Sequence, residues 1–106
     1  MKVLIVEPGQ YPRPAEIENS LEAKQAIVGD LIEMVSPPIH QDDAVLICNE
    51  EGKLLGLEPN RTICLEDGSP YDMICGNFLL CRAPEDSDDF EGLTNEQIAL
   101  YTKMYS

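Results

Sequence analysis

The chain carries little positive charge. Seven lysines and arginines stand against 20 aspartates and glutamates, which gives a formal net charge of −13. Nucleic-acid phosphates and anionic membrane surfaces would repel such a protein, so we expect neither as a direct partner. The acids are spread evenly, with six in residues 1–35, seven in 36–70 and seven in 71–106. An even spread favours a solubilising surface, while an acidic face that imitates DNA is the alternative that charge alone leaves open.

Long hydrophobic runs are absent as well. The longest, Val3–Val6 and Ala44–Cys48, are far shorter than the roughly 18 residues that a membrane-spanning helix needs. Only four apolar residues follow Lys2, whereas the apolar region of a signal peptide needs about seven or more. We therefore expect a cytoplasmic protein. Its 106 residues, 43% of them hydrophobic, suffice for one core, so residues 1–106 are expected to form a single domain.

Motifs for catalysis or metal binding are missing too. The chain has one histidine, His40, and four cysteines without a C-x-x-C pair: Cys48, Cys64, Cys75 and Cys81. Zinc sites and disulfide frameworks usually show close spacings, so buried reduced thiols are the better interpretation. The acidic segment 83–92 lacks the calcium-loop spacing, and neither a phosphate loop nor a nucleophile elbow is present. We predict no catalytic residue, no metal and no cofactor.

Two continuously apolar segments predict interior strands of a sheet. Lys2–Glu7 and Ala44–Cys48 show no alternation, which is typical of strands that are covered on both faces. Between Glu7 and the first helix, residues 8–14 hold three prolines and predict a rigid loop that carries Tyr11 and Arg13.

The second apolar segment is expected to open a β-hairpin. Asn49–Gly52 has turn composition, and Lys53–Leu57 is then expected to pair back onto Ala44–Cys48. Further strands are predicted at Asp30–Val35, Thr62–Leu65, Asp72–Cys75 and Asn77–Cys81, with Gly76 as a bend.

Local capping signals predict two helices. The first is expected to begin after Asn19, with Glu22 at the capping-box position, and to end before Gly29. The second is expected to begin after Thr94, with Gln97 completing a capping box. Its Ile98, Tyr101 and Tyr105 lie on one side, so this helix needs a surface on which to dock.

The order of the elements, with hairpins and no regular alternation of strands and helices, predicts an α+β fold. We expect a mostly antiparallel, curved sheet of five to six strands. One helix packs against this sheet, and the C-terminal helix closes an edge or an end. An acidic loop over residues 83–92 precedes that last helix.

A polar group at the exit of the expected hairpin is the most interesting candidate site. Asn49, Asn60 and Arg61 follow strand segments, and Tyr11 with Arg13 could lie nearby. A guanidinium can clamp a carboxylate or phosphate through two parallel hydrogen bonds, or it can pair with one of the many surface carboxylates. If these five residues form a contact surface, alanine there should leave the melting temperature nearly unchanged and abolish partner capture.

Three segments resemble a known protein family. They are IVGDLIEMV (27–35), AVLICNEEGKLLGLEPNR (44–61) and YDMICGNFLLCRAPEDSDDFEGLT (71–94). Together they are similar to domain-of-unknown-function family 3846, whose members are small proteins of bacterial conjugative elements and phages. The family has no assigned activity or catalytic residues. Its members tend to occur beside antirestriction proteins, so the resemblance implies an accessory or counter-defence role.

The leading hypothesis is a non-enzymatic accessory domain that binds a protein partner. One alternative is an acidic DNA mimic that inhibits a restriction or other DNA-binding enzyme. A second alternative is a small-ligand-binding protein or enzyme with a pocket near Arg61.

Overall fold

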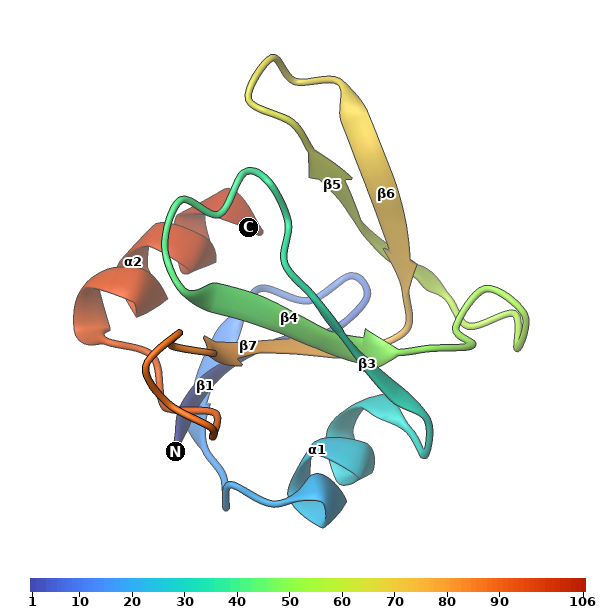
Figure 1. The fold of residues 1–106 in the computed structure, drawn as a ribbon. Helices are drawn as coiled ribbons and strands as arrows, with labels where there is room; N and C mark the ends of the chain where they lie inside the picture. Colours follow the sequence, from blue (N-terminus) through green and yellow to red (C-terminus); the bar gives the residue numbers. More distant parts are fainter.

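The computed structural model describes all of residues 1–106 (Figure 1). The elements are β1 (Lys2–Val6), β2 (Arg13–Glu16), α1 (Leu21–Val28), β3 (Ile32–Val35), β4 (Ala44–Asn49), β5 (Pro59–Cys64), β6 (Pro70–Cys75), β7 (Phe78–Arg82) and α2 (Asn95–Met104). Antiparallel strands and two helices give the α+β fold that the sequence predicts. Neither helix has the length and apolar character that crossing a bilayer requires.

Five strands form the main sheet, in the order β2-β1-β7-β4-β3, and all pairs are antiparallel. β7 lies at the centre, where Phe78 is level with both Val6 and Cys48. The predicted interior position of β1 and β4 is confirmed, because each has a neighbour on both sides. Their buried side chains face both sides of the sheet, which explains the absence of alternation.

The two faces of this sheet carry separate cores. On one face, Val3, Ile47 and Leu79 pack with Val28 of α1. The other face is covered by α2 and by the hairpin of β5 and β6 (Figure 1). This second core contains the following residues, among others: Leu46, Phe78, Ile63, Ile74 and Tyr101. The expectation that α2 closes an edge or an end is wrong, because Tyr101 of α2 and Tyr105, which follows the helix, lie in the core on this face of the sheet.

β5 and β6 form a second sheet of their own, which stands apart from the main one (Figure 1). The predicted single sheet of five to six strands is therefore divided into one of five and one of two. The chain passes from the small sheet to the large one at Gly76, where φ is +84°. An added Cβ there would lie 2.7 Å from Cδ1 of Leu57, so the predicted bend requires glycine for two reasons.

The expected hairpin of Ala44–Cys48 with Lys53–Leu57 is wrong. Residues 50–56 form consecutive turns, and β4 pairs with β3 and β7 instead. A central strand has no free edge to offer to the segment that follows it. Leu54 and Leu55 consequently remain on an exposed loop, where 86% and 61% of their surfaces are accessible to solvent.

The N-terminal boundaries also differ from expectation. Ser20, not Asn19, caps α1 by accepting a hydrogen bond from the backbone of Ala23. The Asn19 side chain instead donates to the Phe90 carbonyl in the acidic loop. Residues 13–14 belong to β2 and not to a loop, since an edge strand tolerates Pro14. By contrast, the capping box of Thr94 and Gln97 at α2 is confirmed in both directions.

Candidate functional site

Arg61 and Asn60 lie together at the start of β5, and the structure uses both internally. Asn60 Nδ2 donates to the carbonyls of Val6 and Gly76, at 2.9 and 2.8 Å. Its Oδ1 accepts from the Arg61 guanidinium at 2.8 Å. Asn60 therefore joins the hairpin to the end of β1 and to the turn that leads into β7.

The Arg61 guanidinium binds backbone carbonyls from distant parts of the chain. Nε donates to the Tyr105 carbonyl at 2.7 Å, and a terminal nitrogen donates to the Gln10 carbonyl at 2.6 Å. No carboxylate forms an ion pair with Arg61, contrary to the expected pairing with surface acids. Arg61 thus ties the end of α2 and the loop after β1 to the small sheet.

The other three candidates are not gathered around Arg61 by any hydrogen bond. Asn49 donates to the Val28 carbonyl at 3.1 Å and accepts from the Glu51 backbone, so it secures the end of α1. Arg13 pairs with Glu7 at 3.1 Å. Tyr11 is 68% exposed and follows Gln10, the residue that Arg61 contacts.

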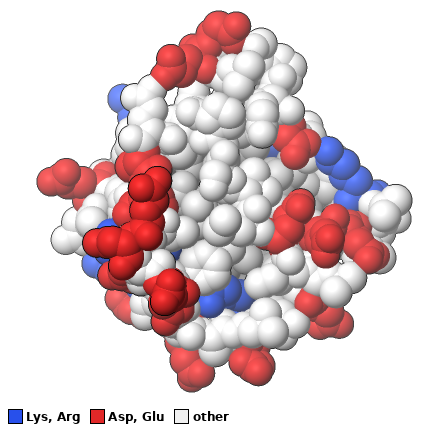
Figure 2. Space-filling view, in the orientation of Figure 1, with Lys and Arg blue, Asp and Glu red and all other residues white.

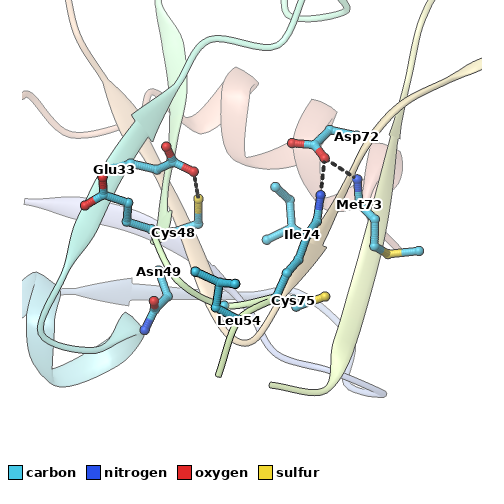
Figure 3. A pocket seen from close by; sticks show the side chains of 11 residues that line it. Glu33, Cys48, Asn49, Leu54, Asp72, Met73, Ile74 and Cys75 are labelled. Atoms are coloured by element: carbon cyan, nitrogen blue, oxygen red, sulfur yellow. Dashed lines mark hydrogen bonds and ion pairs between the residues drawn. The ribbon is translucent and has the colours of Figure 1, made fainter. Parts of the chain in front are cut away.

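A cleft of about 350 Å³ opens between the main sheet and the hairpin (Figure 3). Glu33 of β3 and Cys48 of β4 point into it from one side, and Asp72, Met73 and Ile74 of β6 line the other. Sequence reasoning missed this cleft, because the wrong hairpin placed residues 53–57 where β3 lies. No local pattern identifies Glu33 or Asp72 as neighbours.

The charged groups of the cleft differ in how they are compensated. Lys53 and Asp72 form an ion pair at 2.8 Å. That hydrogen bond lowers the pKa of Asp72 and raises the pKa of Lys53. Glu33 has no cationic partner and accepts only a weak hydrogen bond from the Cys48 thiol, with sulfur and oxygen 3.8 Å apart.

The Cys48 thiol is not prepared for nucleophilic chemistry. Burial, with a contribution from the negative charge of Glu33, raises its pKa to about 12. The thiolate is the reactive form of cysteine, so Cys48 is almost entirely inactive near neutral pH. Covalent chemistry through the Cys48 thiol is therefore disfavoured.

A second polar group surrounds His40 beneath α2. His40 Nδ1 lies 3.0 Å from the Ala44 carbonyl, so this nitrogen carries the proton, and Nε2 accepts from the Tyr105 hydroxyl at 2.6 Å. Burial lowers the pKa of His40. Tyr101 donates to Asp42 at 2.6 Å, and burial raises the pKa of this tyrosine. These bonds fasten the loop before β4 to α2, and no buried side-chain polar atom is left without a partner.

Metal coordination finds no support in the side-chain arrangement. No group of three His, Cys, Asp or Glu side chains comes together in a way that could hold a metal ion, in the acidic loop or elsewhere. All four cysteines are free thiols.

Comparison with known protein families gives one result. The model of a family described as "Domain of unknown function (DUF3846)" matches residues 1–106. Comparisons with curated proteins and with solved structures found no match.

Proposed function

The chain belongs to the DUF3846 family, and we propose that it acts as a protein-binding domain through the cleft between the main sheet and the hairpin. One observation carries the proposal. The cleft combines a carboxylate without a cationic partner, Glu33, with exposed apolar side chains on its rim, Leu54 and Met73. Apolar contact with a few directing charges is the usual composition of a protein interface.

The alternatives have less support. The donors of Arg61 are engaged by the backbone carbonyls of Tyr105 and Gln10 and by the Asn60 side-chain oxygen, which leaves little of the guanidinium for a small ligand. DNA mimicry needs a continuous negative stripe. On the face drawn in Figure 2, the acidic side chains gather in separate groups around a broad uncharged area. Protection of DNA from restriction enzymes in a titration remains the direct assay for mimicry.

We place this activity in the cytoplasm of bacteria that carry a mobile element or phage. The support is the family resemblance together with four free thiols, which suit a reducing compartment. An accessory role toward a host protein follows from that setting.

Affinity capture from a bacterial host lysate tests the proposal. We expect a partner to be retained at high salt, because apolar contact persists when charges are screened. Leu54→Glu should abolish this capture, since it places a charge on the rim of the cleft. Leu21→Glu is the matched control, because Leu21 is an exposed leucine in the first turn of α1. Equal capture by both variants would remove the cleft from consideration.

A further inference from the structure

β3 presents an open sheet edge. It pairs only with β4, and no other segment hydrogen-bonds to its outer side. The Glu50 backbone N–H donates to the Leu31 carbonyl, so Leu31 and every second residue after it form hydrogen-bonded pairs with β4. Glu33 and Val35 therefore exchange hydrogen bonds with β4, while the N–H and C=O groups of Ile32 and Met34 point outward.

The other edge of the sheet is blocked. Met1 and Ile17 exchange two backbone hydrogen bonds beside the β1–β2 ladder, so every second residue of β2 counted from Ile17 bonds to β1. Pro14 is not among these residues, and its backbone nitrogen faces outward. Proline has no N–H to offer an incoming strand, and this is a common way to protect a sheet edge. β3 has no proline within its span, so the fold protects one edge and leaves the other available.

Two hollows lie beside β3. The cleft described above holds the Glu33 side chain on the hairpin face. A groove of about 520 Å³ lies at the other end of β3, between this strand, the segment 36–43 and the beginning of the acidic loop, and Met34, Asp42, Ala83 and Glu85 are among its lining residues. Glu33 lines the first hollow and Met34 the second, and these successive residues of β3 point to opposite faces. Successive side chains of a strand that pairs with β3 would therefore approach the two hollows in turn. Backbone pairing with pockets for alternate side chains is an established mode of peptide recognition.

The charge of these hollows defines the occupant. Glu33 and Glu85, one in each hollow, have no cationic partner. A basic side chain on either face of an added strand would therefore meet an unpaired carboxylate. A second copy of this chain is disfavoured, because it would bring its own net charge of −13 against the same charge.

We propose that a basic, extended segment of a partner protein adds to β3 as a further strand of the main sheet. This inference rests on the proposed protein-binding function and deepens it. The Ile32 and Met34 backbones supply the hydrogen bonds. Lysine or arginine side chains at successive positions of the added strand point to opposite faces, so each reaches one of the two hollows.

Selection of short random peptides against the folded protein tests the chemistry directly. We expect enriched peptides to be basic, free of proline and able to adopt an extended conformation. Salt should weaken their binding only in part, because it screens the contacts of lysine and arginine but not the backbone hydrogen bonds and the apolar contacts. Methylation of single backbone nitrogens in a selected peptide should weaken binding about tenfold at every second residue only, because alternate N–H groups face β3. Acidic or helical peptides, no binder at all, or a methylation pattern without this alternation would overturn the inference.

A variant of the protein gives an independent measurement. Met34→Pro removes an outward N–H and leaves the ladder with β4 intact, in the same way that Pro14 is accommodated in β2. We expect Met34→Pro to lower the affinity for the selected peptide about tenfold or more, while the matched control Met34→Ala changes this affinity little. Tight binding by a folded Met34→Pro variant would overturn strand addition at β3, and if that variant does not fold, the methylation pattern decides alone.

The outcomes separate this inference from the function on which it rests. Lysate capture that is lost with Leu54→Glu but unchanged with Met34→Pro would preserve protein binding and reject strand addition. Dimer formation in solution that depends on Met34 would instead identify a second copy as the occupant.

Discussion

Replacing Arg61 by alanine should destabilise the fold rather than expose a silent surface. The substitution removes hydrogen bonds to the carbonyls of Tyr105 and Gln10 and to the Asn60 side chain. Hydrogen bonds from a charged donor contribute about 1.5–3 kcal/mol each. Arg61 is half-buried, and water can replace part of what is lost, so we expect a total loss of about 2–4 kcal/mol.

This loss is large for a chain of 106 residues. At about 4 °C per kcal/mol, the melting temperature should fall by about 8–16 °C. Urea unfolding, followed by circular dichroism, would give the free energy directly. Arg61→Lys should recover less than half of the loss, because an ammonium group cannot reach three acceptors in the geometry of a planar guanidinium.

Arg13→Ala is the matched control. Arg13 is exposed and forms a single surface ion pair with Glu7, so its loss should cost less than about 1 kcal/mol. If Arg61→Ala melts no lower than Arg13→Ala, Arg61 is not a structural tie. The sequence-based expectation of a neutral alanine substitution would then be correct, and Arg61 would again be a candidate for partner contact.

Two further predictions concern the interior. Burial lowers the pKa of His40 below 6.5 in the folded state, so the unfolded chain binds the extra proton first. His40 should therefore contribute stability that is present above about pH 6.5 and is lost as the pH falls toward its folded pKa, and unfolding of His40→Gln should depend less on pH in that window. Gly29→Ala should destabilise more than Gly9→Ala in thermal melts. Both glycines have positive φ, but only at Gly29 would the added Cβ meet another side chain, 2.5 Å from Asn49 Nδ2. Equal melting temperatures for the two glycine variants would contradict the close packing of α1 against Asn49.

The sequence alone determined those features that depend on neighbours along the chain. The capping box at α2 needs only Thr94 and Gln97, which are three residues apart. The unbroken apolar character of β1 and β4 reports burial on two faces wherever the strands pair. Both signals act over a few residues, so they can be interpreted without knowledge of the rest of the fold. Together they led to the correct fold class.

Tertiary structure decided which segments became partners. Lys53–Leu57 has a plausible strand pattern, yet β4 was already paired on both sides, so this segment became an exposed loop. Pairing across a sheet is settled by contacts between residues far apart in sequence, which no local pattern records.

The same reason applies to the candidate sites. Arg61 and Asn60 attracted attention as polar residues at a strand exit, but only the fold shows that distant carbonyls take up their donors. The cleft at Glu33 arises where the hairpin and the main sheet approach one another, and the open edge of β3 arises because no other segment pairs with this last strand of the main sheet. Both surfaces depend on which strands pair and pack when the chain folds, so local sequence patterns do not predict them.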